Sequence, residues 1–414
     1  MLTACQNDAL YEGRVVKSLT AVMQIALLFL ANISVTNELI WAAFFKAAGH
    51  HPSLPAYILP PSNFVTPQQP HPKIDRLPEC LYPGMMQQLT GAANVSAEQA
   101  SHACLQLSKH IAFASRMSEK CKSHAPSVID DQQLFNVYMH SAYPELVDCN
   151  SIFAKYQIRN RVYTKHGYCQ FATMAGALAL LQTALLNPEN THFMQLSDTS
   201  IPLYHPALVY VHFLSLSKPY VNACPHEPTL QKAHRYPSLF TGQFLPRHWR
   251  KSMAWFVLQR DWAQFVLHDR HVIEVFKRWC VSPKQYCNCI ADEHYIASLF
   301  ASYEMDNMTE CRYDIHYQDW ARIKASHPHS FKVEEINSTL LPLMRGHHCV
   351  SNYETSMASA LHVLNMTTHV ESLDKLYDSM PLGCSLFARK FPANTQQAVY
   401  AMLTHGDNAD PFHE

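Results

Sequence analysis

Hydrophobic and polar positions form alternating blocks along the chain, and these blocks predict strands and helices in turn. The apolar run at 22–33 (VMQIALLFLANI) is bounded by polar residues, as is typical of a buried parallel strand. Residues 36–47 then carry apolar side chains at helical spacing, with Thr36 or Asn37 as the cap. The same reasoning predicts strands at 134–140, 161–165, 191–204, 252–258 and 312–320, and helices at 170–187, after 258 and from 292.

An alternation of this kind indicates an α/β fold with a mostly parallel central sheet and helices on both faces. Ligands of such sheets lie beyond the carboxyl ends of the strands. Two polar strand ends, His140-Ser141 and Ser197-Asp198-Thr199, are therefore the expected places for a site.

One domain over residues 20–395 accounts for this pattern, interrupted at about 50–131 by a Pro-rich and then polar insertion. A helix at Ser96–Arg116 is the only regular element expected within the insertion. We expect residues 1–19 and 396–414 to be poorly ordered tails. The apolar run at 22–33 also resembles a signal-peptide core or a short anchor, but it is shorter than the ~20 apolar residues that span a bilayer.

Composition narrows the class of protein. Charged residues make up 16% of the 414 residues, with 32 Lys+Arg against 33 Asp+Glu, so no basic surface for nucleic acid is indicated. The 10 glycines form no GxGxxG, GxxxxGK[ST] or GxSxG motif. A bound phosphate would therefore be held by side chains.

The cysteines and glycosylation sequons favour a secretory lumen. There are 13 cysteines and no CxxC pair, and Asn-x-Ser/Thr sequons stand at Asn32, Asn94, Asn307, Asn337 and Asn365. Cys280, Cys287, Cys289 and His294 lie close together in the sequence and could form a zinc site, although CxC is not the usual spacing of zinc ligands.

Several segments in order resemble the core-2/I-branching β-1,6-N-acetylglucosaminyltransferase family, glycosyltransferase family 14, especially its plant and algal branch. They run from about residue 24 to 392 and read QIALLFLAN…ELIWAAFF, VYMHSA, FMQLSDTSIPLYHP, WRKSMAWFVLQRD, DEHYIASL, DW…SHP and LFARKF. The resemblance implies a GT-A-like nucleotide-sugar fold and an inverting transfer from a UDP-sugar to a glycan or glycoprotein acceptor. The sugar would be like N-acetylglucosamine or xylose.

The resemblance also implies a place in the Golgi lumen or membrane. Family members carry a transmembrane anchor before the catalytic domain, whereas only a short stretch precedes the first strand here, so we expect the anchor to be missing or the chain to be truncated. Neighbouring cysteines in plant-like relatives imply that at least one of Cys280, Cys287 and Cys289 is disulfide-bonded. A catalytically inactive, lectin-like or scaffold member of the same fold is the alternative function.

The match assigns Glu293 as the base that takes the proton of the acceptor hydroxyl. Without the match, Glu293 would be read as a carboxylate that stabilises the helix dipole. Adjacent helical residues point about 100° apart, so Asp292 is expected to be a cap or a hydrogen-bonding support. A glycosidase would need two carboxyl groups facing one another across the bond.

The departing diphosphate is expected to be bound by cations and not by a metal. Asp198 stands alone where many GT-A enzymes have a two-carboxylate metal clamp, and the resembling family is metal-independent. Lys390 matches the family lysine, and Arg345 is the best candidate for its partner, with Arg389 as the fallback. Each of these could instead be a solvated surface cation.

The remaining candidates are assigned by their place in the matching segments. His140 and Asp198 are expected at the nucleotide and donor pocket. The Arg250-Lys251 pair, Trp255 and Trp320 are expected on the acceptor side, where aromatic faces stack on sugar rings. Structural packing is the alternative for His140 and for either tryptophan.

Overall fold

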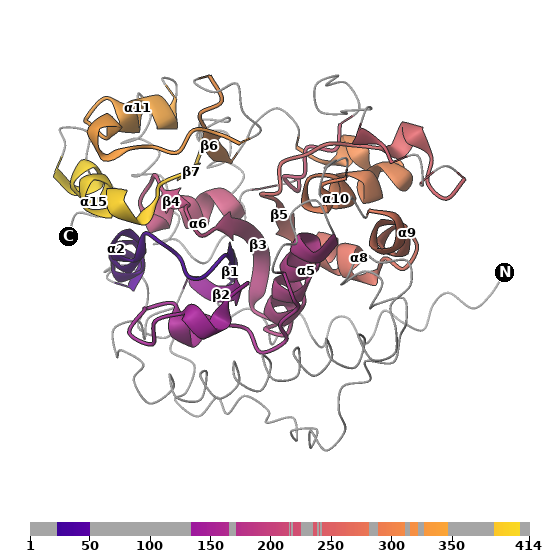
Figure 1. The fold of residues 1–414 in the computed structure, drawn as a ribbon, viewed down its shortest axis with the longest axis horizontal. Helices are drawn as coiled ribbons and strands as arrows, with labels where there is room; N and C mark the ends of the chain where they lie inside the picture. Colours follow the sequence, from indigo (N-terminus) through magenta and orange to yellow (C-terminus); the bar gives the residue numbers. More distant parts are fainter. Residues whose placement is uncertain are drawn as a thin grey trace, which may run out of the picture.

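The computed structural model describes residues 23–49, 134–164, 171–214, 218–224, 242–280, 289–310, 315–321, 327–346 and 385–405, together with residues 216, 235–237 and 240 (Figure 1). Its central sheet has four strands in the order β2-β1-β3-β5. β1 (Gln24–Ala31) pairs in parallel with β2 (Phe135–Ser141) and with β3 (Asn190–Ser197), and β3 pairs antiparallel with β5 (Val257–Gln259). The predicted α/β class with a mostly parallel sheet is confirmed.

Strand β1 is buried on both faces, and this explains its unbroken apolar sequence. Ile25, Leu27 and Phe29 belong to one hydrophobic core, which also includes side chains of α2 and α6. Ala26 and Leu28 belong to a second core with side chains of α5 and α10. The sheet therefore lies between two helical layers, which Figure 1 shows on either side of it.

The helices of the described residues are α2 (Glu38–Gly49), α5 (Phe171–Leu185), α6 (Pro206–Leu214), α8 (Arg260–His268), α9 (Val272–Trp279), α10 (Ala291–Ser302), α11 (Leu340–Arg345) and α15 (Gln396–His405). Short 3-10 turns are η2 (Pro144–Leu146), η3 (Ala154–Tyr156), η6 (Pro246–His248), η7 (Asp306–Met308), η8 (Val333–Glu335) and η9 (Ala393–Thr395). None of these helices is long and apolar enough to cross a bilayer.

A second, smaller sheet has the order β4-β7-β6. β4 (Ile201–Pro202) follows the turn after β3 and pairs antiparallel with β7 (Phe387–Arg389). β6 (His316–Gln318) pairs in parallel with β7 on its other side. This sheet brings the end of the patterned sequence, Arg389 and Lys390, to the turn that follows β3.

Three expectations need correction. Residues 161–164 form no strand, because the backbone N–H and C=O of Val162 both lie at hydrogen-bonding distance from the His140 imidazole. The strands expected at 252–258 and 312–320 shrink to the short pairing segments β5 and β6. Residues 396–405 are no loose tail, since they form α15 and pack on α2. The insertion at 50–131 with its expected helix, the first tail and residues 406–414 lie outside the described residues.

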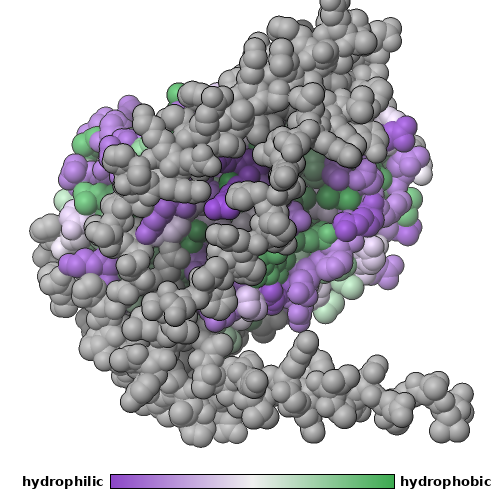
Figure 2. Space-filling model, turned by 90° about the horizontal axis from the view of Figure 1, so that it is seen from below, coloured by the Kyte–Doolittle hydropathy of each residue, from purple (hydrophilic) through white to green (hydrophobic). Residues whose placement is uncertain are grey.

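The surface of the described part is chemically mixed. Figure 2 shows hydrophilic and hydrophobic side chains interspersed on one face.

Candidate active site

Asp198 ties together the turns that follow β1 and β3. Its Oδ2 accepts a hydrogen bond of 3.1 Å from the backbone N–H of Asn32, and its main-chain oxygen accepts one of 2.9 Å from the N–H of Thr36. Burial raises the pKa of the Asp198 carboxyl, and the Asn32 N–H and the positive charges of Arg389 and Lys390 oppose that rise. The lone aspartate at the strand end thus lies in the field of two cations.

Arg389 and Lys390 form this pair of cations, at the end of β7. Arg389 lies on the indole of Trp255, with its Cζ 4.4 Å from the ring centroid. Burial lowers the pKa of Arg389 to about 10, while Asp198, Asp292 and Glu293 favour its charged form. Its Nε is buried without a hydrogen-bond partner among the described residues. The guanidinium is therefore charged at neutral pH, and its Nε is not satisfied by the residues that the structure describes.

Lys390 is held beside it in a similar environment. Burial and then the charge of Arg389 lower the pKa of Lys390, and Asp198 opposes them. Two adjacent cations that repel one another in this way favour a ligand with more than one negative charge.

The first turn of α10 brings two carboxyl groups to the same region. Glu293 Oε2 lies 2.8 Å from Arg235 Nη1 and 3.8 Å from Lys251 Nζ. Burial, and then the negative charge of Glu293, raise the pKa of Asp292 to about 7, against the opposing effect of Lys251 and Arg389. The two neighbours therefore differ: Glu293 pairs with cations, whereas the pKa of Asp292 is raised toward neutral pH.

His327 shares this environment. Burial lowers its pKa, followed by the charges of Lys390 and Arg389, while Glu293 opposes the change. Lys251 was expected on the acceptor side, whereas His327 and Arg235 were not among the residues assigned from the sequence. His327 lies in the SHP segment of the resemblance, but no motif pointed to Arg235.

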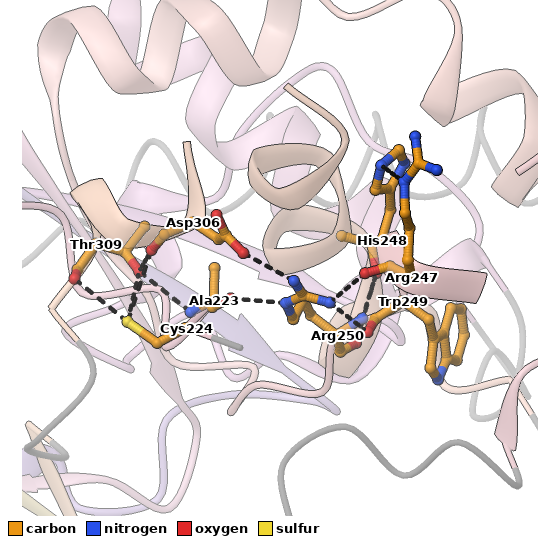
Figure 3. Close-up of polar contacts among 9 residues, drawn as sticks. Ala223, Cys224, Arg247, His248, Trp249, Arg250, Asp306 and Thr309 are labelled. Atoms are coloured by element: carbon orange, nitrogen blue, oxygen red, sulfur yellow. Dashed lines mark hydrogen bonds and ion pairs between the residues drawn. The ribbon is translucent and has the colours of Figure 1, made fainter. Parts of the chain in front are cut away.

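Arg250, assigned to the acceptor side, is buried in a network of its own (Figure 3). Its Nη2 lies 2.7 Å from Asp306 Oδ2, and its Nε donates to the carbonyl of Ala223 at 2.9 Å. Its Nη1 donates to the carbonyls of Arg247 and Trp249 at 2.7 and 3.1 Å. These contacts brace the segment before Lys251 against η7.

Arg345 is buried against the segment that follows β4. Arg345 is 2% exposed, and its Nε and Nη2 donate to the carbonyl of Leu203 at 2.8 and 2.6 Å. Its Cζ also lies 4.6 Å from the ring centroid of Tyr204. Arg389, the fallback candidate, is instead the arginine whose charge acts on the carboxyl groups of the site.

The other residues assigned from the sequence lie in different surroundings. His140 is fully buried at the end of β2, with its Nε2 3.0 Å from the carbonyl oxygen of Val162, and burial lowers its pKa to about 4. Trp255 lies against Arg389, beside the pair of cations at the end of β7. Trp320 is 42% exposed.

The cysteine cluster contains a disulfide, as predicted. Cys280 and Cys289 are bonded and close the segment between α9 and α10, and Cys287 lies outside the described residues. The two bonded sulfurs are not available as thiolate ligands of zinc. His294 Nδ1 lies 2.6 Å from the carbonyl of Arg250, and no group of three or more possible ligands is assembled within the described part of the chain.

A nucleotide-sugar transferase is the class of protein that this α/β fold and its cation pair suit. A model of the core-2/I-branching enzyme family matches residues 118–345, more than half of the chain, and the chain therefore belongs to that family. Glycosyltransferase BC10 of rice, Oryza sativa subsp. japonica, is 24% identical over 291 residues, which cover 63% of this chain and 67% of the rice protein. The protein is thus a glycosyltransferase, and the resemblance to the plant branch is confirmed.

Proposed function

We propose that the protein is an inverting, metal-independent glycosyltransferase that moves a sugar like N-acetylglucosamine or xylose from UDP to a hydroxyl group of a glycan or glycoprotein. The observation that carries this proposal is that Glu293 and the strand-end Asp198 both lie in the electrostatic field of Arg389. Membership of the family supports the classes of donor and acceptor.

Glu293 is the proposed general base. Its Oε2 is engaged by Arg235, whereas its Oε1 has no hydrogen-bond partner among the described residues. The side chain is 28% exposed, so an acceptor hydroxyl can reach it. That hydroxyl oxygen attacks the anomeric carbon as its proton passes to Oε1 and the bond from carbon to the diphosphate oxygen breaks.

Arg389 and Lys390 are the proposed partners of the departing UDP. Fixed cations stabilise the charge that develops on a leaving group without a metal ion. We assign the arginine role to Arg389 in place of Arg345, because the guanidinium of Arg345 is directed to the carbonyl of Leu203. We place Asp198 beside the donor diphosphate and Trp320 on the acceptor side.

We also propose that the enzyme works in the lumen of the Golgi. The Cys280–Cys289 disulfide supports an oxidising compartment. The sequon residues Asn307 and Asn337 are exposed, as glycosylation would require.

A panel of UDP-sugars tests the mechanism with the purified full chain in EDTA. We expect hydrolysis or transfer of one donor, and a loss of at least about 100-fold for Glu293→Gln with UDP binding kept, since general bases contribute 10²–10⁴-fold. Glu274→Gln is the matched control, because Glu274 is an exposed carboxylate that pairs only with Lys277 among the described residues.

Two results would contradict the mechanism: activity that requires added Mn²⁺, or full activity of Glu293→Gln. A third result, no UDP binding at millimolar concentration, would favour the inactive lectin-like or scaffold alternative.

A further inference from the structure

We infer that Thr36 and Asn37, in the turn between β1 and α2, are positioning residues for the cations that bind the diphosphate. This inference rests on the function proposed above. We call the pair the Thr36–Asn37 clamp. It joins the chain segment of Asp198 to the segment of Arg389 and Lys390.

The clamp holds the carbonyl of Phe391, the residue directly after Lys390. Asn37 Nδ2 donates to this oxygen at 2.9 Å, and the hydroxyl of Thr36 lies 3.2 Å from it. The same hydroxyl lies 3.0 Å from the main-chain oxygen of Asp198, and Asn37 Nδ2 is 3.2 Å from Thr36 Oγ1. One small polar cluster thus contacts both segments of the proposed donor site.

The backbone around Lys390 is fixed from other directions as well. The N–H of Phe391 donates to the carbonyl of Thr199 at 3.1 Å, in the turn that carries Asp198. The N–H of Phe331 donates to the carbonyl of Lys390 at 3.0 Å. The clamp therefore completes a set of contacts that fixes where the two cations stand relative to Asp198.

The side chain of Asn37 is not used as an ordinary helix cap. An asparagine before a helix commonly accepts a hydrogen bond from the helical N–H groups through its side-chain oxygen. Here the N–H groups of Ile40 and Trp41 bond to the main-chain oxygen of Asn37. Asn37 Oδ1 is buried with no hydrogen-bond partner among the described residues, although an unsatisfied buried acceptor is costly.

We expect the clamp to strengthen binding of the diphosphate and to leave binding of the nucleoside unchanged. The attraction between charges falls as the distance between them grows. If both cations move by about 1 Å from near contact with the diphosphate, the affinity for UDP falls roughly tenfold at an effective dielectric constant of ~20. A nucleoside without phosphates does not experience that loss.

The test compares UDP with uridine by titration calorimetry on the full chain. Thr36→Val removes the hydroxyl at nearly constant shape and is expected to weaken UDP binding about tenfold with uridine unchanged, and to lower kcat. Thr36→Ser keeps the hydroxyl and should restore UDP binding. Thr183→Val is the matched control, since it makes the same change in α5, where the Thr183 hydroxyl donates to the carbonyl of Ala179.

Lys390→Met separates the two proposals. If Lys390→Met weakens UDP binding but Thr36→Val does not, or if Thr36→Val weakens UDP and uridine equally, the clamp is refuted and the donor site stands. If the wild-type protein binds no UDP, or Lys390→Met leaves binding intact, both proposals fail. Thermal unfolding of each variant confirms that the comparison is made on folded protein, and Asn37→Ala provides a second probe of the clamp.

Discussion

Removing the guanidinium of Arg250 should destabilise the fold, because this side chain braces three segments of the chain. Arg250→Met keeps most of the aliphatic stem and leaves the Asp306 carboxylate, 2.7 Å away in the native protein, without its partner. Arg250 itself is 7% exposed, so water replaces these contacts poorly. Breaking a buried ion pair from one side costs about 3–5 kcal/mol. A typical domain is stable by only about 5–15 kcal/mol, so the loss is a large fraction of the total.

Urea unfolding, followed by fluorescence and circular dichroism, measures this loss. Arg247→Gln is the matched control, since Arg247 is exposed and such changes usually stay within about 0.5 kcal/mol. The double variant Arg250→Met/Asp306→Leu should recover part of the stability, because it no longer leaves a charge buried alone.

The result that would refute this reasoning is specific. If Arg250→Met unfolded at the wild-type urea concentration and raised only the KM for the acceptor, Arg250 would be the acceptor-side residue that the family resemblance implied. The bracing network would then contribute little to the fold.

Three further predictions concern the site and its surroundings. Since the folded pKa of Asp292 is about 7, above the ordinary value of about 4, the folded protein keeps this proton where the unfolded chain loses it, and the wild type loses stability as pH rises from about 4 to about 7. Asp292→Asn should therefore gain urea resistance over the wild type from pH 5 to 8, and a constant difference would contradict this. Cys280→Ala/Cys289→Ala should lower the free energy of unfolding by about 2–3 kcal/mol, the value for a short closed loop, and reductant should then have no further effect through this bond. Trp255→Leu should weaken UDP binding by releasing Arg389, whereas Trp255→Phe should keep part of it; a change in acceptor KM alone would return Trp255 to the acceptor side.

The strongly patterned elements of the fold were predictable from the sequence, and the short ones were not. Strand β1 and helix α5 carry long apolar runs, because β1 contributes side chains to both hydrophobic cores and much of α5 is buried in the second core. β5 and β6 have three residues each, and what makes them strands is pairing with a distant segment. Hydrophobic periodicity carries no information about such pairing, so these two strands were predicted to be longer than they are.

The site was predictable where a motif fixed both residue and element. Glu293 lies in the first turn of α10, the helix expected from residue 292, whereas Lys390 was assigned by its motif alone and follows β7, a strand that was not predicted. The choice between Arg345 and Arg389 was not predictable, because both are basic residues at the end of an element. Only the tertiary structure turns one toward the Leu203 carbonyl and the other toward Trp255.

Arg250 and Lys251 show why neighbouring residues in one motif need separate treatment. In an extended segment successive side chains point to opposite sides. Arg250 accordingly reaches Asp306, away from the proposed site, while Lys251 lies 3.8 Å from Glu293. The N–H of Ser252 then donates to the carbonyl of Glu293 at 2.7 Å and fixes the same segment to the start of α10. Bracing by Arg250 and the environment of the proposed base are therefore two consequences of one extended segment, and weakening the first should loosen the second.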